Sequence, residues 1–293
     1  MDLLILGGNG YLGSKLLRAL NEEGGHRLVC TVRDGADRSR LTSLTERGKV
    51  RCIPPLPEAI LAAMEETSFD AVCNMACSYG RKGMLYPNVL EANLEFPLRV
   101  LNAAADRGIG RFITIGTGLP EEMNMYSFSK HMFSSFGRYY AEHYGIGFCA
   151  LRLEMFYSAD EPRDRFIPKL IEQMTLGRDV DVSIGTQHRD IIAVEDVLRA
   201  ILLVLHTDWS GYQEIPVGTG IAPTIGELVD FVWEETGRVS RVNRGAFPMR
   251  ENEPDCVADT TRLRQLGGGR WEPVFWQDGI REMIRRIDGE RME

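Results

Sequence analysis

A glycine-rich turn lies between two apolar segments at the start of the chain. Residues 3–6 are Leu-Leu-Ile-Leu, a run of strand length, and leucines then recur at helical spacing over residues 12–20. In such a strand–turn–helix unit, one glycine permits the turn, a second lets backbone N–H groups approach a pyrophosphate, and a third allows close packing of helix on strand. The spacing Gly-x-x-Gly-x-x-Gly therefore predicts a dinucleotide-binding loop, with a bare tight turn as the alternative. The residues expected to contact the coenzyme are Gly7, Asn9, Gly10, Tyr11, Leu12 and Gly13.

The segment after the second predicted strand bears on the choice of coenzyme. Residues 28–32 predict this strand, and Arg33 follows it directly. An NAD-selective site normally has an acidic residue here for the ribose hydroxyls, whereas a guanidinium can hold the 2′-phosphate of NADP with two hydrogen bonds. Arg38 and Arg40 are within loop reach. NADP(H) is therefore favoured and NAD(H) is the second candidate, with a solvated Arg33–Asp34 pair as the alternative for Arg33.

Tyr126 and Lys130 stand four residues apart near the start of a predicted helix that Gly145 ends. Positions four apart share a helix face, so the Lys130 ammonium can lie near the phenol and near a nicotinamide ribose. This cation and the positive helix end both favour the phenolate, so the pKa of Tyr126 is expected below its usual value of about 10. The pair is a candidate for proton transfer, although surface pairs share this spacing. The packed face of the helix is predicted to consist of Met132, Phe133, Phe136, Tyr140 and Tyr144.

Thr117 follows the apolar run 111–115, which predicts a core strand of a parallel sheet. Ligands of open α/β folds bind at the carboxyl ends of such strands. The Thr117 hydroxyl can donate a hydrogen bond to a carbonyl or alkoxide oxygen while Tyr126 moves the proton. Thr117 is therefore the third candidate catalytic residue, with a simple turn threonine between glycines as the alternative.

At this point the chain resembles the extended short-chain dehydrogenase/reductase family, the NAD-dependent epimerase/dehydratase group that acts on nucleotide-activated sugars. The resemblance implies that Ala76 and Asn93 lie beside the coenzyme and that Arg189 and Arg250 grip the substrate diphosphate. Each arginine could instead form an ion pair, Arg189 with the neighbouring Asp190. Besides the glycine loop and the Thr117, Tyr126 and Lys130 set, the resemblance rests on Asn93 and on segments 70–76, 151–157, 188–197 and 258–267.

Some positions depart from the family pattern. Met155 stands where many members have an asparagine that contacts the diphosphate, and Gly118 and Leu119 stand where the 4,6-dehydratases have an Asp-Glu pair. Dehydration is therefore disfavoured. The short segment before Tyr126 and the loop at residues 76–81 resemble the CDP-abequose and CDP-paratose synthase branch, which reduces 4-keto nucleotide sugars with NADPH.

The resemblance implies an NADP(H)-dependent reductase of a 4-keto nucleotide-diphosphate sugar, with Tyr126 as proton donor and with Ser78 and Tyr79 as candidate sugar contacts. An NAD-dependent nucleotide-sugar 4-epimerase would use the same three catalytic residues. A non-catalytic protein that senses dinucleotides is the remaining reading, and it would need no proton donor. The nucleotide base and the sugar stereochemistry are not encoded in these motifs.

Length and patterning indicate the fold class. The 293 residues are 44% hydrophobic and can bury a large core. Predicted strands alternate with helices through about residue 155, which indicates an α/β Rossmann fold, a doubly wound parallel sheet with a smaller C-terminal substrate-binding lobe. The NAD(P)-binding domain is expected to span residues 1–155, with 178–220 partly returning to it. The substrate-binding lobe takes 156–177 and 221–293.

Composition narrows the partners. The net charge of −8 and the lack of a basic stripe argue against nucleic acid, and no apolar run reaches the length of a membrane span. The first strand starts directly after Met1, so a signal peptide is not expected, and the compartment is expected to be cytoplasmic. The histidines lack metal-ligand spacing, and no metal is expected. Apolar residues on the helices that carry Asn93 and Tyr126 suggest a homodimer. Buried, reduced thiols are expected for the cysteines at positions 30, 52, 73, 77, 149 and 256.

Overall fold

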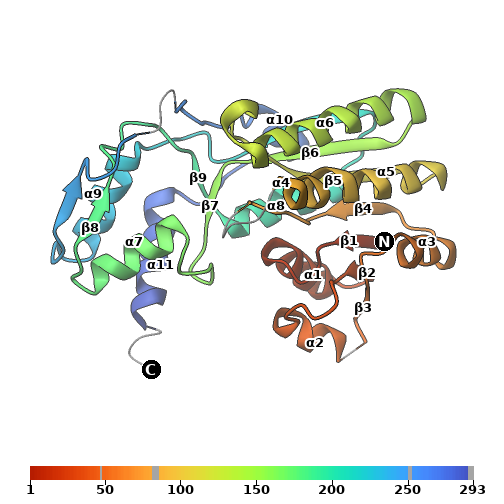
Figure 1. Ribbon diagram of the computed structural model, residues 1–293, viewed down its shortest axis with the longest axis horizontal. Helices are drawn as coiled ribbons and strands as arrows, with labels where there is room; N and C mark the ends of the chain where they lie inside the picture. Colours follow the sequence, from red (N-terminus) through yellow and green to blue (C-terminus); the bar gives the residue numbers. More distant parts are fainter. Residues whose placement is uncertain (47, 81–85, 250–252, 290–293) are drawn as a thin grey trace. The chain divides into compact units, whose positions relative to one another are not determined.

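The computed structural model describes residues 1–46, 48–80, 86–249 and 253–289. It divides into two compact units, each formed by two stretches of chain (Figure 1). The first unit comprises Met1–Arg152 and Ile201–Ile215, and the second comprises Leu153–Ala200 and Pro216–Glu293. The chain therefore leaves the first unit after Arg152 and returns to it through a single helix and strand.

The first unit is built on a seven-stranded sheet with the order β10-β6-β5-β4-β1-β2-β3. Five neighbouring strands in this order, from β5 to β3, pair in parallel, and Leu4 of the central strand is in register with Val29 and Val72. The doubly wound α/β prediction is confirmed. The strands are β1 Asp2–Leu6, β2 Arg27–Thr31, β3 Val50–Ile53, β4 Ala71–Asn74, β5 Arg111–Thr117, β6 Gly147–Leu153 and β10 Tyr212–Val217.

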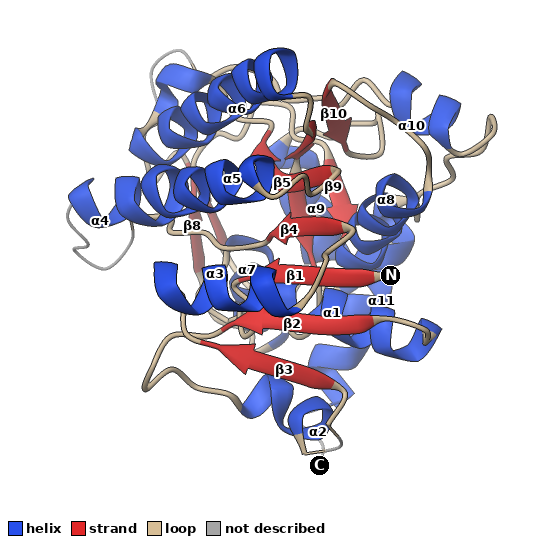
Figure 2. Cartoon of the chain, turned by 90° about the vertical axis from the view of Figure 1, so that its right-hand side faces the viewer, coloured by secondary structure: helices blue, strands red, loops and turns tan. Residues whose placement is uncertain are grey.

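Helices cover both faces of this sheet because right-handed crossovers join successive parallel strands. Helices α3, α5 and α6 lie together on one face, and α1 lies on the other (Figure 2). Asn93 lies in a π-helical turn, Glu91–Glu95, between α4 and α5. The helices are α1 Tyr11–Glu23, α2 Thr42–Thr45, α3 Pro57–Glu66, α4 Tyr86–Leu90, α5 Phe96–Asp106, α6 Met125–Tyr144 and α8 Val194–His206, with short 3₁₀ turns at Ser39–Leu41 and Glu121–Met123.

Helix α6 packs on the sheet mainly through small residues. Its buried side consists of Ser127, Ser129, Lys130, Phe133, Ser134, Gly137 and Ala141. The packed face predicted from the aromatic residues is therefore wrong in part, because Phe136 and Tyr144 are exposed and only Phe133 is fully buried. Gly145 ends the helix with φ 73°, as expected.

Gly137 lets α6 approach the aromatic core. Phe112, Phe133 and Phe148 pack with ring centroids 5.6–5.8 Å apart, and a Cβ on Gly137 would lie 2.2 Å from the Phe148 ring. On an open helix position, alanine stabilises by about 1 kcal/mol relative to glycine. Here the clash reverses that sign, and we expect Gly137→Ala to destabilise the protein by about 1–3 kcal/mol in urea unfolding. Ser135→Ala, an exposed change on the same helix, should have little effect, and a more stable Gly137→Ala protein would contradict this packing.

The second unit has its own apolar core. Helices α7, α9 and α11 pack together around buried residues such as Ile171, Leu228 and Ile280. Helix α9 begins with the predicted capping box, in which Thr224 Oγ1 accepts from the Glu227 N–H at 3.0 Å and a Glu227 carboxylate oxygen accepts from the Thr224 N–H at 2.7 Å. The elements are β7 Met155–Tyr157, α7 Phe166–Thr175, β8 Val180–Val182, β9 Ile191–Ala193, α9 Ile225–Glu235, β11 Val242–Arg244, α10 Thr261–Leu266 and α11 Trp276–Gly289, with β7 parallel to β9 and β8 parallel to β11.

Candidate active site

The glycine loop joins β1 to α1 in a tight turn. Gly7 has φ 77°, its N–H donates to Thr31 Oγ1 at 2.9 Å, and its carbonyl accepts from the Gly10 N–H at 3.0 Å. A Cβ on Gly13 would lie 2.2 Å from the Gly7 carbonyl oxygen, so the start of α1 can approach β1 this closely only with glycine. Helix α1 has no side-chain cap and no acidic residue in its first turn. No side-chain cap and no acidic side chain of this helix therefore competes with an anionic ligand at its N-terminal end.

The arginine segment after β2 is tethered to this loop. Asn9 Nδ2 donates to the Asp37 carbonyl at 3.1 Å, and the Arg40 guanidinium lies 5.8 Å from the centre of the Tyr11 ring. Arg33 is exposed, and within the described residues it forms no ion pair with Asp34. The structure therefore does not contain the pair considered as the alternative for Arg33.

Lys130 is a buried cation at the carboxyl end of β4. Its side chain is 3% exposed, and Nζ donates to the Ala76 carbonyl at the long distance of 3.4 Å. Among the described residues no carboxylate lies within ion-pair distance of Nζ. Burial lowers the pKa of Lys130, because the charged form loses hydration. The ammonium group has three N–H donors, and among the described residues their only acceptor is the distant Ala76 carbonyl. It is therefore suited to donate to the hydroxyl groups of a ligand.

Tyr126 lies in the first turn of α6, half-buried beneath Tyr79. The two ring centroids are 4.9 Å apart with an interplanar angle of 36°. Asn93, which is fully buried, holds the Tyr79 loop in place, since its Oδ1 accepts from the Ser78 N–H at 2.7 Å and its Nδ2 donates to the Ser78 carbonyl at 2.8 Å. The Nδ2 group also donates to Ser129 Oγ at 3.1 Å on α6. Asn93 therefore clamps the loop after β4 to the helix that carries Tyr126 and Lys130.

Thr117 is the last residue of β5 and is 5% exposed. Its Oγ1 accepts from the Leu119 N–H at 3.2 Å, which leaves the hydroxyl proton to donate elsewhere. Its backbone carbonyl accepts from Arg152 Nε at 3.3 Å. Thr117 is therefore the last residue of a strand, and hydrogen bonds from Leu119 and Arg152 fix its position.

Two sets of contacts around Thr117 were not anticipated from the sequence. His131 Nε2 lies 2.9 Å from the Leu119 carbonyl, so the helix residue after Lys130 anchors the Thr117 loop. Arg152 Nη1 also donates to Glu214 Oε1 at 2.9 Å, which links the end of β5 to β10. Glu214 in turn accepts from the Tyr212 hydroxyl at 2.5 Å. No local motif signals the contacts of His131 and Arg152, since their partners Leu119 and Glu214 are 12 and 62 residues away.

The start of α6 also has a cap that was not anticipated. Asn124 Oδ1 accepts from the Ser127 N–H at 2.9 Å, and Ser127 Oγ accepts from the Asn124 N–H at 3.1 Å. This capping box sets where the helix begins and so puts Tyr126 in its first turn. The signal was present in the sequence as Asn124 followed three residues later by a serine.

In the second unit, Arg189 forms a buried ion pair. Its Nη2 lies 2.5 Å from Glu253 Oε1, and its Nη1 donates to the Pro254 carbonyl at 2.5 Å and the His188 carbonyl at 2.8 Å. This favours the ion-pair alternative for Arg189, but the partner is Glu253 and not the adjacent Asp190. The Asp190 carboxylate instead accepts from the backbone N–H groups of Thr219, Gly220 and Ala258. Arg250, the other expected diphosphate ligand, lies outside the described residues.

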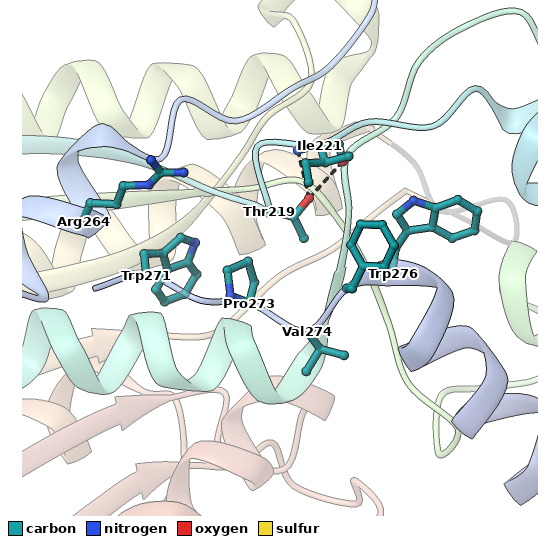
Figure 3. Close-up of a pocket in the computed structure, with 8 residues that line it drawn as sticks. Thr219, Ile221, Arg264, Trp271, Pro273, Val274 and Trp276 are labelled. Atoms are coloured by element: carbon teal, nitrogen blue, oxygen red, sulfur yellow. Dashed lines mark hydrogen bonds between the residues drawn. The ribbon is translucent and has the colours of Figure 1, made fainter. Parts of the chain in front are cut away.

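A small cavity of about 180 Å³ is present in the second unit (Figure 3). Ligand sites for molecules of drug size usually enclose about 300–1,000 Å³. Thr219, at its edge, already hydrogen-bonds to Asp190 and the Ile221 carbonyl. The cavity is lined mainly by apolar and aromatic side chains, and it contains none of the site residues predicted from the sequence. The lining residues are Thr219, Ile221, Arg264, Trp271, Pro273, Val274, Phe275 and Trp276.

Three further observations concern metal sites, membrane spans and the cysteines. Within residues 1–46, 48–80, 86–249 and 253–289, no group of His, Cys, Asp and Glu side chains is arranged to hold a metal ion. No helix in the described part of the chain is long and apolar enough to cross a membrane. None of the six cysteines forms a disulfide. The expectation of burial is wrong for Cys77, which is exposed in the loop before Ser78, and Cys52 is half-buried.

A parallel α/β sheet with an uncapped glycine loop, and a Tyr–Lys pair on the helix after its fifth strand, is typical of short-chain dehydrogenases/reductases. A model of the NAD dependent epimerase/dehydratase family matches residues 3–218. The chain belongs to this family and is an NAD(P)-dependent oxidoreductase.

Individual proteins agree with the family match. The CDP-abequose synthase of Salmonella muenchen is 27% identical over 292 residues, which cover 96% of this chain and 96% of that protein. The CDP-abequose synthase of Salmonella typhimurium is 28% identical over 302 residues, covering 97% of this chain and 98% of that protein. The crystal structure of UDP-glucose 4-epimerase from Thermotoga maritima with UDP-glucose has a TM-score of 0.85 at 20% identity and covers all of both chains. That structure supports the fold.

Proposed function

We propose that the protein is an NADP(H)-dependent reductase of a 4-keto nucleotide-diphosphate sugar. The observation that carries this proposal is the buried Lys130 ammonium, which has one weak acceptor and lies on the same helix as Tyr126. The relatives named CDP-abequose synthase support reduction, and the UDP-glucose 4-epimerases among the similar proteins make epimerisation the second candidate. Gly118 and Leu119, in place of an Asp-Glu pair, disfavour dehydration.

The residues present fit a dinucleotide. The tight glycine turn that Gly13 permits, the lack of a side-chain cap at the start of α1 and the unfilled donors of Lys130 match a pyrophosphate and a ribose. When bound, the reduced coenzyme supplies the hydride. Gly7, Asn9, Gly10, Tyr11, Leu12 and Gly13 would hold it, together with Ala76, Asn93 and Lys130, with Asn93 acting through the Ser78 loop.

Three side chains carry out the catalytic steps. The Thr117 hydroxyl donates a hydrogen bond to the keto oxygen and stabilises the charge that develops there. Tyr126 gives its proton to the same oxygen. Lys130 holds the ribose hydroxyls and, as a cation, favours loss of the tyrosine proton. Tyr79 and Ser78 contact the sugar, with the Tyr79 ring against the Tyr126 ring.

A coenzyme assay tests this function. The protein would be incubated with NADPH or NADH and a panel of CDP-, dTDP-, UDP- and GDP-4-keto-6-deoxyhexoses while absorbance at the nicotinamide band is followed. We expect oxidation of NADPH with one of these sugars. In a second arm the protein would be incubated with 4-hydroxy nucleotide sugars such as UDP-glucose, and inversion at C4 there without net coenzyme oxidation would support the 4-epimerase instead. No conversion in either arm would contradict both candidates.

The coenzyme preference follows from Arg33. We expect Arg33→Asp to lower kcat/KM for NADPH at least about tenfold more than for NADH, because a charge-assisted contact to the 2′-phosphate is lost. Lys49→Asp is the matched control. It makes the same charge change at an exposed position just before β3, at the amino end of the strand that pairs with β2, whereas Arg33 follows the carboxyl end of β2. Equal effects of Arg33→Asp on the two coenzymes would contradict the 2′-phosphate contact.

We also propose a homodimer that pairs through α6. The helix exposes Phe128, Phe136, Tyr139 and Tyr144, with exposed fractions of 39–56% for the last three. Several exposed aromatic side chains on one helix are usual where another protein surface packs. Light scattering of the purified protein should give twice the mass of the chain, and a monomeric mass at micromolar concentration would contradict it.

A further inference from the structure

Two thiols lie against each other beneath the glycine loop. Cys30 on β2 and Cys52 on β3 are register partners on neighbouring parallel strands, and their Sγ atoms are 3.6 Å apart. Adjacent strands are spaced about 4.8 Å apart, which is within the Cα separation of about 4.4–6.8 Å that disulfides span. The sulfur atoms would need to close to about 2.05 Å to form a bond.

The two cysteines differ in environment. Cys30 is fully buried, whereas Cys52, the residue before the last of its strand, is half-buried. The hydrogen bond from Cys30, together with the charge of Arg38, lowers the pKa of the Cys52 thiol to about 7. The same contact and burial raise the pKa of Cys30. A partly accessible thiolate with a protonated thiol beside it is suited to attack an oxidant and then to be resolved by its neighbour.

We propose that Cys52 and Cys30 form a peroxide-sensitive modification site that closes into a reversible disulfide. The Cys52 thiolate attacks one oxygen of hydrogen peroxide, the O–O bond breaks, and the departing oxygen takes up a proton and leaves as water. The Cys52 sulfenic acid is then attacked by the Cys30 sulfur, the S–O bond breaks, and a second water leaves with the Cys30 proton. Two thiols are oxidised and one peroxide is reduced to two waters.

The bridge acts on the coenzyme loop through Gly8. A Cβ on Gly8 would lie 2.6 Å from the Cys30 side chain, and the Gly8 N–H donates to the Thr31 carbonyl at 3.0 Å. Because Gly8 of the glycine loop packs directly against Cys30, movement of the Cys30 sulfur toward Cys52 changes the packing that holds the loop in place. Oxidation therefore weakens coenzyme binding. This consequence rests on the proposed coenzyme site, whereas formation of the disulfide does not.

The experiment uses the full chain with Cys77→Ser, because the exposed Cys77 thiol would otherwise react as well. The reduced protein is treated with dilute hydrogen peroxide and digested, and its peptides are mapped by mass spectrometry. We expect a linked Cys30–Cys52 peptide, the loss of two titratable thiols, and recovery of both with dithiothreitol. The affinity for NADPH should fall at least about tenfold on oxidation and return on reduction.

Matched variants separate this site from other thiols. Cys30→Ser should leave a Cys52 sulfenic acid that dimedone traps, and Cys52→Ser should abolish the bridge. Cys73→Ser, at a buried thiol whose pKa burial raises to about 12, should leave the bridge intact. An unmodified Cys52, or oxidation without linkage to Cys30, would overturn the proposal. A bridge that leaves NADPH affinity unchanged would overturn its effect on the loop, while failure of the reduced protein to bind any coenzyme would count against the proposed function alone.

Discussion

Replacing Tyr126 by phenylalanine should lower turnover about 10²–10⁴-fold, the usual contribution of a positioned general acid, while coenzyme affinity stays nearly unchanged. Phenylalanine preserves the ring that packs against Tyr79 at 4.9 Å between centroids, and it removes only the hydroxyl. The loss should appear in kcat, because the hydroxyl acts on an oxygen that becomes charged in the transition state. Steady-state kinetics with the best sugar of the panel, together with titration of coenzyme binding, measure both quantities.

The control for this change is Tyr139→Phe, which removes a hydroxyl from an exposed tyrosine of the same helix. It should leave kcat unchanged. Full activity of the Tyr126→Phe protein would remove Tyr126 from proton transfer. An equal loss of coenzyme binding would instead assign the Tyr126 hydroxyl to the binding of the coenzyme.

Gly13→Ala should abolish measurable coenzyme binding at micromolar concentration. The new Cβ would lie 2.2 Å from the Gly7 carbonyl oxygen, which is backbone and cannot rotate away. The Gly7 N–H is already bonded to Thr31, so the turn and the start of α1 must separate. That separation moves the uncapped N–H groups away from the position they need for a pyrophosphate. Fluorescence titration with NADPH and NADH gives the affinities.

Gly110→Ala is the control for Gly13→Ala. The position precedes β5 in the same unit, and a Cβ there would meet nothing closer than 4.0 Å. The Gly110→Ala protein should bind coenzyme like the unmodified protein. A Gly13→Ala protein that folds and binds NADPH with unchanged affinity would contradict the glycine-loop assignment.

The sequence was sufficient to predict the elements that depend on local patterns. The apolar run before Gly7, the glycine spacing and the leucine period define β1, the turn and α1, because each depends on residues close along the chain. The capping box at Thr224 and Glu227 is a local pattern of the same kind. These features need no knowledge of which distant segments meet.

Features set by distant contacts could not be predicted in this way. Arg189 stands next to Asp190 in the chain, but its carboxylate partner is Glu253, 64 residues away. The bond from His131 to the Leu119 carbonyl likewise depends on how the loop after β5 folds back on α6. Aromatic residues on α6 predicted a packed face, but Gly137 and the serines let the small-residue side approach the core, which left Phe136 and Tyr144 exposed.

The most direct test of the proposed reduction is isotope transfer. The protein would be incubated with NADPH that carries deuterium on the transferred position of the nicotinamide and with the reactive 4-keto nucleotide sugar, and the product examined by NMR. We predict one deuterium at C4 of the sugar for each coenzyme oxidised, and at least about a hundredfold less labelled product with the Tyr126→Phe protein over the same time. A product that carries only hydrogen at C4, formed without oxidation of the added coenzyme, would contradict it.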